Sequence, residues 1–456
     1  MSKKEGSLSL IRKLGYGIGD MGSNFCWSFV AAFIMIYCTN TLGVSAAIIG
    51  TLMMISKILD GVTDVFMGNI IDRTNHKMGK ARFWYFVSCF PVAVFTFIIF
   101  NVPKNLSDTE KYVFFFIIYT LLGAVFYTMN NIAYSSMTAL CTKDPKDRVQ
   151  MGSFRFLFAI IAVLIIQTIT SGMVESLGGG QAAWTQVSII YSIVCFVLLL
   201  VPVFSVKELS PEELGEQENV NKTANEKIGF VESIKLLVKN KYFVLILCIY
   251  LVNYIVSGLT SGLGIYYATY KLGNAALLGV ISMASLIPII IALPLVAPFT
   301  AKYGIRKMSI LGNILGLVAT IPLVIAAVSG NLPLLLVALA LKTIGGAPLT
   351  GALNALIAET DDYSYLKFGK RITGTIYSCS SVGVKVGTGL GTALTGFLLD
   401  FGGFDGQAAE QTARAISVIN WSYVLAYAIP GVILLTILFF LDVESENKKL
   451  RTDKEV

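Results

Sequence analysis

Long apolar runs separated by short polar segments are the main pattern along the chain. A run of about 20 apolar residues can cross the hydrocarbon core of a bilayer as an α-helix. Twelve such runs are present, at residues 15–40, 46–71, 83–101, 112–139, 152–174, 185–206, 242–267, 276–300, 308–328, 332–357, 372–399 and 419–442. The pattern predicts an all-α, polytopic membrane protein with twelve transmembrane helices.

Positively charged residues lie mostly on one side of the predicted spans. If the N-terminus is cytoplasmic, 27 of the 35 Lys and Arg residues fall in cytoplasmic segments. The exceptions are Lys104, Lys111, Lys271 and Arg414 in the opposite loops, and Lys57, Arg155, Lys342 and Lys385 in or at the ends of spans. Because cytoplasmic loops are enriched in Lys and Arg, we expect a multi-pass protein of the cell membrane with both termini in the cytoplasm.

The densest charge of the chain lies in residues 207–241, between the sixth and seventh predicted spans. We interpret this segment as a cytoplasmic linker. It joins an N-terminal six-helix bundle, residues 1–206, to a C-terminal six-helix bundle with a cytoplasmic tail, residues 242–456.

The two halves also resemble each other in sequence. "IYCTNTLGVSAAIIGTLMMIS" (36–56) aligns with "YYATYKLGNAALLGVISMAS" (266–285) with one gap, so that Tyr, Thr, Leu-Gly, Ala-Ala and Gly fall in register. Such a parallel repeat is typical of transporters built from two pseudo-symmetric six-helix halves.

The composition supports a membrane protein and argues against several other classes. The chain is 55% hydrophobic and only 14% charged, whereas soluble domains are about 25% charged. The net charge of +7 is spread over short loops, which does not indicate a nucleic-acid partner. A single histidine, His76, and seven scattered cysteines form no pattern of metal ligands or disulfides. No span carries a nucleophile and base set, so we expect neither an enzyme nor a bound cofactor.

The stretch "SKILDGVTDVFMG" (56–68) places Lys57, Asp60 and Asp64 inside the second predicted span. Helical geometry puts all three on one stripe. An ionisable residue at the centre of a membrane helix costs about 2.5 kcal/mol or more, so it needs a partner or a function. Two carboxylates and one lysine leave one surplus negative charge, which a small cation or a proton can balance.

The second copy of the repeat is apolar where the first is charged. Its corresponding residues are Leu286, Ile289 and Leu293. A general scaffold role would need the charges in both copies, so the pattern indicates a site that belongs to the N-terminal half.

Other polar residues lie at a similar predicted depth, about 8–20 Å from the cytoplasmic ends of their spans. They are Asp20, Asn24, Thr128, Asn131, Arg155 and Lys385. We expect them to converge on a central layer, where transporter sites lie between the halves.

The same residues also allow structural interpretations. Asp60 and Asp64 could form only an ion pair with Lys57, and Arg155 could pair with one of these carboxylates. Asp20 could be solvated or could pair with Lys13. The span residues Asn24, Thr128 and Asn131 could join helices by hydrogen bonds, and Lys385 could be structural.

The glycine-rich stretch "GYGIGDMG" (15–22) opens the first predicted span. No strand precedes it, so it does not fit a nucleotide-binding loop. Close helix packing or bending is the better interpretation.

At these residues the chain resembles the glycoside–pentoside–hexuronide:cation symporters of the major facilitator superfamily, the group that contains melibiose permease and the glucuronide carriers. The resemblance covers nearly the whole chain. It rests on "KLGYGIGDMGSNF" (13–25), "ILDGVTDVFMGNIIDRTNHKMGKARFW" (58–84), "YTMNNIAYSS" (127–136), "ETDDYSYLKFGKRITGTIYSCSSVGVK" (359–385) and the "GGF" after the eleventh span. It implies the major facilitator fold.

The resemblance implies a cation site on the second and fourth spans. Asp60 and Asp64 fall on the family's paired cation-site aspartates, and Thr128 falls on the threonine that completes the site. Thr63 stands where melibiose permease has asparagine, which leaves Na⁺ at Asp60 and Asp64 as one option and H⁺ as the other. Lys57 replaces an arginine and is assigned to coupling.

The resemblance also implies a sugar pocket. Its candidate residues are Asp20, Asn24, Asn131, Tyr134 and Arg155, with Lys385 near the cation site as a second coupling residue. Asn24 and Asn131 replace sugar-binding aspartates of melibiose permease. The loss of two negative charges near Arg155 and Lys385 suggests a hexuronide as substrate.

The stretch "GNIIDRTNHKMGK" (68–80) resembles the superfamily's loop between the second and third spans. It implies a cytoplasmic gate at Gly68, Asp72 and Arg73. A positively charged anchoring loop explains the lysines equally well, but not Gly68 and Asp72.

The function that we expect is secondary active symport of a sugar or glycoside with Na⁺ or H⁺, by alternating access in a monomer. Its partners are the sugar, the cation and the lipid bilayer, with no nucleic acid. The alternatives are a neutral oligosaccharide or pentoside as substrate, a lysolipid transporter, and a non-transporting membrane receptor.

Overall fold

The computed structural model describes residues 8–210, 213, 237–369 and 373–455. Within these ranges the secondary structure is helical, and twelve helices are long and apolar enough to cross a membrane. The prediction of a polytopic all-α protein with twelve spans is confirmed.

The helices of both halves follow the predicted spans closely. The N-terminal half contains α1 (Leu10–Ile36), η1 (Tyr37–Thr41), α2 (Ala46–Arg73), α3 (Lys80–Ile99), α4 (Asp108–Thr120), η2 (Leu121–Tyr127), α5 (Thr128–Leu140), α6 (Pro145–Ser176) and α7 (Gly180–Ser205). The C-terminal half contains α10 (Lys241–Tyr266), η4 (Tyr267–Lys271), α11 (Leu277–Tyr303), α12 (Ile305–Ser329), α13 (Leu332–Phe368), α14 (Thr373–Gly402), α15 (Ala413–Phe440) and α16 (Val443–Glu455).

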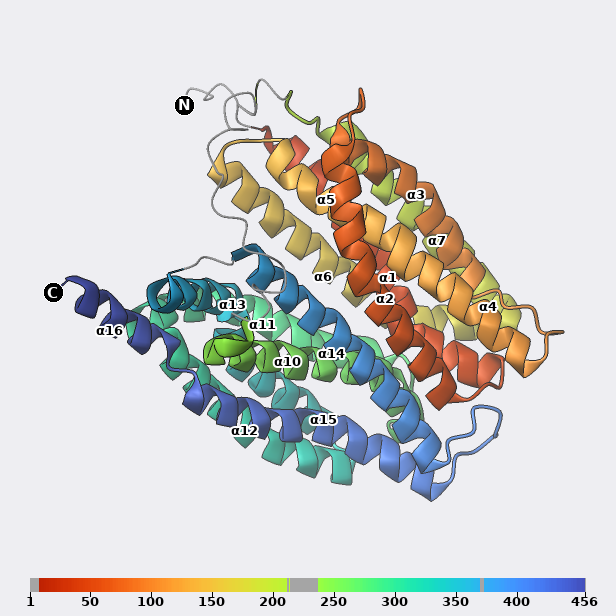
Figure 1. Ribbon diagram of the computed structural model, residues 1–456. Coiled ribbons are helices and arrows are strands. Elements are labelled where there is room, and N and C mark those ends of the chain that lie inside the picture. Colours follow the sequence, from red (N-terminus) through yellow and green to blue (C-terminus); the bar gives the residue numbers. More distant parts are fainter. Residues whose placement is uncertain (1–7, 211–212, 214–236, 370–372, 456) are drawn as a thin grey trace. The chain divides into compact units, whose positions relative to one another are not determined.

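The chain divides into two compact units. The first comprises Met1–Asn225 with Asp405–Glu410, and the second comprises Glu226–Phe404 with Gln411–Val456. Helix pairing is the same in both: α1 packs on α6 and α7 as α10 packs on α14 and α15, and α3 packs on α5 and α7 as α12 packs on α13 and α15 (Figure 1). The structure therefore repeats, as the aligned sequences predict.

The repeat extends to an unusual backbone feature. η1 and η4 are five-residue π-helices, and both lie in the aligned stretches that contain the shared Tyr, Thr and Leu-Gly. In each unit the π-helix ends the first span shortly before the second begins. Because π-helical segments are rare, their occurrence at matching positions is strong support for the internal repeat.

Glycines bring the helices of each unit into close contact. A Cβ atom at Gly22 of α1 would lie 2.9 Å from the backbone nitrogen of Leu199, so the close packing predicted for the 15–22 stretch is confirmed. In the second unit, a Cβ atom at Gly391 of α14 would clash with the carbonyl oxygen of Ile255 on α10. Such backbone contacts are typical of membrane helix interfaces.

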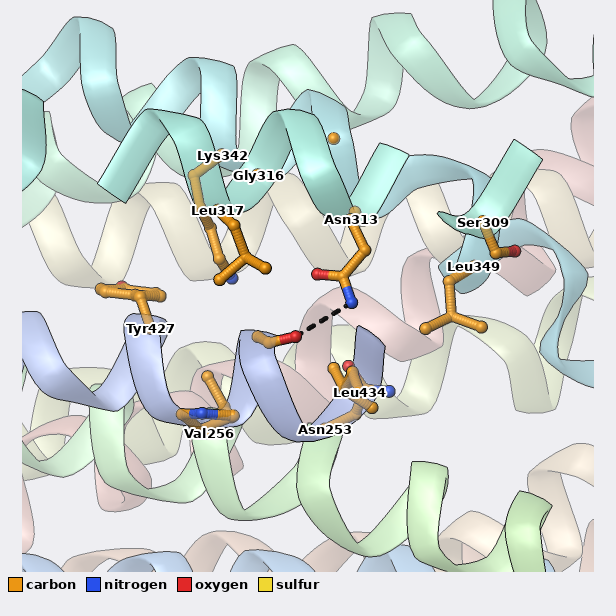
Figure 2. Close-up of a pocket in the computed structure, with 14 residues that line it drawn as sticks. Asn253, Val256, Ser309, Asn313, Gly316, Leu317, Lys342, Leu349, Tyr427 and Leu434 are labelled. Atoms are coloured by element: carbon orange, nitrogen blue, oxygen red, sulfur yellow. Dashed lines mark hydrogen bonds between the residues drawn. The ribbon is translucent and has the colours of Figure 1, made fainter. Parts of the chain in front are cut away.

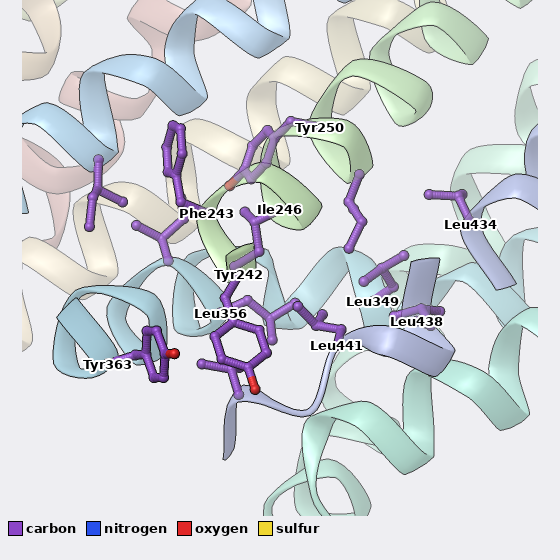
Figure 3. Packing of buried hydrophobic residues seen from close by; sticks show 14 of the residues in the cluster. Tyr242, Phe243, Ile246, Tyr250, Leu349, Leu356, Tyr363, Leu434, Leu438 and Leu441 are labelled. Atoms are coloured by element: carbon purple, nitrogen blue, oxygen red, sulfur yellow. The ribbon is translucent and has the colours of Figure 1, made fainter. Parts of the chain in front are cut away.

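An apolar cluster fixes the end of the second unit where α15 turns into α16. Tyr242 of α10, Leu356 and Tyr363 of α13, and Leu438 and Leu441 pack together there (Figure 3). α13 continues to Phe368, eleven residues beyond the predicted end of the span at residue 357. Hydropathy marks only where the apolar run ends, whereas a helix with internal backbone hydrogen bonds can continue into water.

We predict that Gly391→Ala destabilises the protein, because its new methyl group meets backbone atoms of α10 that cannot move aside separately. Overpacking of this kind costs about 1–3 kcal/mol, so the thermal unfolding midpoint of the purified protein should fall. Gly172→Ala on α6 is the matched control, since a Cβ atom there meets nothing within 4 Å. Equal midpoints for the two variants would contradict the proposed α10–α14 contact.

Candidate functional site

An ion pair joins Lys57 and Asp60 on α2, as expected for two residues on one face of the helix. Lys57 Nζ lies 3.2 Å from Asp60 Oδ2, and the two side chains are 12% and 8% exposed. The Lys57 ammonium also lies 3.6 Å from the centre of the Trp27 ring on α1. Lys57 is therefore stabilised both by a carboxylate and by an aromatic face.

A π-helix in the fourth span positions the second partner of Asp60. η2 ends at Tyr127, immediately before Thr128, and Thr128 donates its hydroxyl hydrogen to Asp60 Oδ1. The carbonyl oxygen of Gly123 lies 3.2 Å from the same hydroxyl oxygen, five residues earlier in the chain. Asp60 thus uses one oxygen for Lys57 and the other for Thr128, and it is 5% exposed.

Two further predicted cation-site residues lie on the next turn of α2. Thr63 donates its hydroxyl to the backbone oxygen of Asp60 at 3.0 Å, which leaves the lone pairs of its oxygen for another partner. Asp64 is partly buried, four residues after Asp60 and hence on the same face of the helix. The stripe keeps one surplus negative charge when Lys57, Asp60 and Asp64 are all ionised.

A second ion pair joins α1 and α6. Arg155 Nε lies 2.7 Å from Asp20 Oδ2, and the side chains are 19% and 14% exposed. The open alternative that Asp20 pairs with Lys13 is wrong, because Lys13 pairs with the buried Asp147 at 2.5 Å. Arg155 does pair with a carboxylate, but its partner is on α1 rather than on α2.

Two asparagines predicted to bind sugar differ in their contacts. Asn24 donates its amide to the backbone oxygen of Asp20 at 2.8 Å and accepts a hydrogen bond from Ser28 at 3.1 Å. The Asn131 carboxamide is partly buried and hydrogen-bonds to none of the described residues. Asn131 is therefore free to bind a ligand.

The neighbouring Asn130 has a structural role instead. Its amide donates to Ser88 on α3 at 2.9 Å, and its oxygen accepts from Ser23 on α1 at 3.4 Å. Asn130 thus joins three helices, which is the role that sequence reasoning left open for Asn131. Adjacent residues on a helix point about 100° apart, so one asparagine faces the bundle core and the other does not.

Tyr134 is fully buried. Its ring stacks on Tyr16 with centroids 4.6 Å apart, and its hydroxyl donates to the backbone oxygen of Tyr16. The Arg155 guanidinium carbon lies 4.3 Å from the ring centre. Tyr134 therefore stabilises the Arg155 guanidinium with its ring face. Its direct contact with a substrate stays a prediction.

The remaining predicted residues are placed individually. Lys385 is partly buried on α14 of the second unit, and its proximity to Asp60 and Asp64 stays a prediction. A Cβ atom added at Gly68 on α2 would meet no atom within 4 Å, so no close approach requires glycine there. Asp72 and Arg73 end α2, are exposed, and form no side-chain hydrogen bond or ion pair within the described residues.

Sequence reasoning missed Trp27 and two glutamates. Besides contacting Lys57, Trp27 lies 3.5 Å from the Cβ position of Gly123 in η2, so it links α1, α2 and the fourth span.

Glu208 accepts hydrogen bonds from the backbone nitrogens of Lys80, Ala81 and Arg82 at the start of α3. In the second unit, Glu444 accepts hydrogen bonds from the backbone nitrogens of Ile305 and Arg306 at the start of α12.

These two glutamates form the same motif in each unit. Each follows the last span of its unit and caps the helix that begins after Gly79 or Gly304, both of which have a positive φ. The signal available in the sequence was an acidic residue just after the sixth and twelfth spans. Its capping role depends on packing that hydropathy does not show.

The oxygen atoms around Asp60 and Asp64 determine which ligand this site can bind. The Asp60–Asp64 stripe offers carboxylate and hydroxyl oxygens, which are the ligands that hard cations prefer. No group of three or more His, Cys, Asp or Glu side chains in the described part of the chain is arranged to hold a metal ion. A cation here would therefore be held by two carboxylates and neutral oxygens, which suits weak, reversible binding.

Comparison with known proteins identifies the family. The chain matches the family described as MFS/sugar transport protein over residues 15–445. It is 28% identical to an isoprimeverose transporter of Lactiplantibacillus pentosus over 97% of this chain and 91% of that protein. It is also 28% identical to a glucuronide carrier protein homolog of Escherichia coli (strain K12), over 90% and 88%. A putative glycoside/cation symporter of the same strain is 25% identical, over 91% and 87%.

The solved structures agree at the level of the fold. A bacterial homolog of the human lysosomal transporter Spinster, in an inward-facing and unoccupied conformation, superposes with a TM-score of 0.68 at 15% sequence identity, covering 96% of each chain. The family match and the curated relatives make the protein a multi-pass membrane transporter rather than an enzyme. The chain belongs to the MFS/sugar transport protein family.

Proposed function

We propose that the protein takes up a sugar or glycoside together with a monovalent cation by alternating access. The observation that carries the proposal is Asp60, a buried membrane carboxylate held between Lys57 and Thr128. The names of the relatives, which include a glycoside/cation symporter, support the same function. The bias of Lys and Arg supports a cell-membrane protein with both termini cytoplasmic, and we propose that it works as a monomer.

The cation replaces Lys57 as the counter-charge of Asp60. In the structure the ammonium neutralises the carboxylate, and the Trp27 ring lies close enough to keep the displaced ammonium stabilised. Asp64 supplies the second negative charge. A monovalent cation bound between the two carboxylates would bring the net charge of the stripe to zero, with the displaced Lys57 ammonium still counted in it.

Thr128 completes the site by turning its hydroxyl. Its hydrogen now points to Asp60, but the carbonyl oxygen of Gly123 is a second acceptor at 3.2 Å. If the hydrogen turns to Gly123, the lone pairs of the hydroxyl oxygen face Asp60 and can bind a metal cation. The π-helix matters because it leaves the Gly123 carbonyl beside Thr128. A proton as coupling ion would need no such turn.

The sugar site lies beside the Asp20–Arg155 pair. Asn131 has an unpartnered carboxamide, and Asn24 is held next to Asp20. Amide, carboxylate and guanidinium groups together offer both donors and acceptors for sugar hydroxyls. Because Asp20 already balances the charge of Arg155, a hexuronide would have to compete with Asp20, and we propose a neutral glycoside as the better substrate.

The end of α2 provides the gate. Asp72 and Arg73 are exposed and unpaired within the described residues, so both remain able to form ion pairs in another state of the transport cycle. Lys385 would complete the coupling from the second unit.

We predict that Asp64→Asn abolishes cation-driven accumulation of the sugar in proteoliposomes, because the second carboxylate of the site loses its charge. Coupling between two ligands is typically about 5- to 150-fold in affinity, and this gain should be lost. The assay compares neutral glycosides and glucuronides, with and without sodium and a pH gradient. Asp108→Asn is the control, since that side chain is 68% exposed. Normal accumulation by Asp64→Asn would refute the cation site.

We predict that Thr128→Val raises the half-saturating sodium concentration on the order of tenfold if sodium is the coupling ion, because one oxygen ligand is removed. Thr128→Ser keeps the hydroxyl and should behave like the wild type. The measurement is initial uptake rate against sodium concentration at fixed pH, and equal sodium dependence in all three proteins would exclude Thr128 as a ligand.

The Asp20–Arg155 pair allows its structural and binding roles to be separated. Arg155→Met leaves Asp20 without its partner and should cost about 3–5 kcal/mol of stability, as for other buried pairs. The double variant Asp20→Asn/Arg155→Met should recover much of the unfolding midpoint but not the sugar affinity. If the double variant binds sugar as tightly as the wild type, the pair serves only the fold.

A further inference from the structure

A cavity of about 60 Å³ lies inside the second unit, between α10, α12, α13 and α15 (Figure 2). Its lining is polar in the middle of an apolar bundle and includes Asn253, Ser309, Asn313, Lys342 and Tyr427. None of these residues has a part in the proposed cation or sugar site. The proposed function leaves this cavity unexplained.

Lys342 brings an uncompensated positive charge to the cavity. It forms no ion pair with any described residue, and its Nζ lies 4.6 Å from the centre of the Tyr427 ring. Residues 233–358 and 411–441 contain no Asp or Glu. The first acid further along α13 is Glu359, which helical rise places about 25 Å away.

A charged side chain inside a membrane bundle requires compensation. The face of Tyr427 contributes part of it. Figure 2 shows Lys342 and Asn313 reaching across the cavity from their helices toward α15, where Tyr427 lies. Asn313 donates its amide to the Gly431 carbonyl oxygen at 3.1 Å, so its own oxygen can accept a hydrogen bond from the ammonium or from water. No negative charge is supplied by the described residues that line the cavity.

The size of the cavity limits what can supply that charge. At about 10–15 Å³ for each water-sized position, it holds a few waters or one small ion with water. It is far below the roughly 300 Å³ of a small-molecule pocket, so a sugar does not fit. Gly346 helps to keep the space open, because a Cβ atom there would meet nothing within 4 Å.

We propose that this cavity binds a small monovalent anion of the size of chloride, with the Lys342 ammonium as its counter-charge. The buried Ser309 hydroxyl, which has no hydrogen-bond partner among the described residues, lies further along the same cavity and donates to the water that hydrates the ion. The anion is separate from the transported sugar and its coupling cation.

Thermal unfolding of the purified full-length protein tests the site without any sugar. Sodium and ionic strength are held constant while sodium gluconate is replaced by sodium chloride or sodium bromide. Gluconate is too large for the cavity. A ligand that binds only the folded state raises the unfolding midpoint with its concentration, so chloride and bromide should raise it and gluconate should not. Equal midpoints in the three salts would show a cavity that holds only water and would overturn the proposal.

Two variants assign the effect to this cavity. Lys342→Met keeps the length of the side chain without its charge and should remove the chloride and bromide shift. Lys302→Met is the matched control, because Lys302 is an exposed lysine 5.2 Å from the ring centre of Tyr303 in the same unit. It should keep the full shift. If Lys342→Met keeps the shift as well, the anion binds elsewhere and the proposal is wrong.

A cavity-filling variant gives an independent test that retains the lysine. Gly346→Leu should reduce the halide shift, whereas Gly346→Ala should largely preserve it, because only the larger side chain takes up the volume an ion needs. Crystals grown in bromide should show anomalous density next to Lys342 in the wild type. If the midpoint shifts with halide but no anomalous bromide density appears next to Lys342, the anion binds elsewhere and the proposal is wrong. Transport assays are not involved, so this test and that of the proposed function can fail separately.

Discussion

A carboxylate inside a membrane bundle has to be neutralised, and Asp60 shows how the first unit achieves this. One of its oxygens pairs with Lys57 and the other accepts the hydroxyl of Thr128. Each contact depends on a particular backbone feature. Lys57 reaches Asp60 because the two are three residues apart on α2, and Thr128 reaches it from the end of the π-helix η2. Loss of the Lys57 contact would leave an uncompensated buried charge at a cost of several kcal/mol, and loss of the Thr128 contact would leave a buried carboxylate oxygen without its hydrogen-bond donor.

The two units share a scaffold but not a charge pattern. Both have a π-helix at the end of the first span, the same helix pairing, and a glutamate that caps the third span. Asp20, Asp60 and Asp64 lie inside spans of the first unit, whereas residues 233–358 of the second unit contain no Asp or Glu. The repeated features are those that hold helices together, so they could be retained in both copies while the ionisable residues diverged.

Sequence periodicity predicts which residues share one face of a helix. The predictions that needed only this information are confirmed. The twelve spans, the repeat and the Lys57–Asp60 stripe follow from periods of apolar and charged residues. Partners on other helices do not follow from periodicity. For Asp20 the sequence allowed a pair with Lys13, but its partner is Arg155. The hydrogen bonds that join helices are made by Asn130 rather than by Asn131. The π-helix η2 has no hydropathy signature, so the contact that it gives Thr128 could not be predicted.

The first helix links the two ion pairs, and this suggests how sugar and cation could affect each other. Asp20 holds Arg155, Asn24 is bonded to the backbone of Asp20, and Trp27 covers Lys57. These residues span two turns of α1, about 10 Å along the helix axis. A cation that displaces Lys57 from Asp60 changes what Trp27 must stabilise, and a sugar that binds at Asn24 changes the other end of the same segment. Reciprocal coupling requires one element that both ligands bias, and this part of α1 contacts both proposed sites.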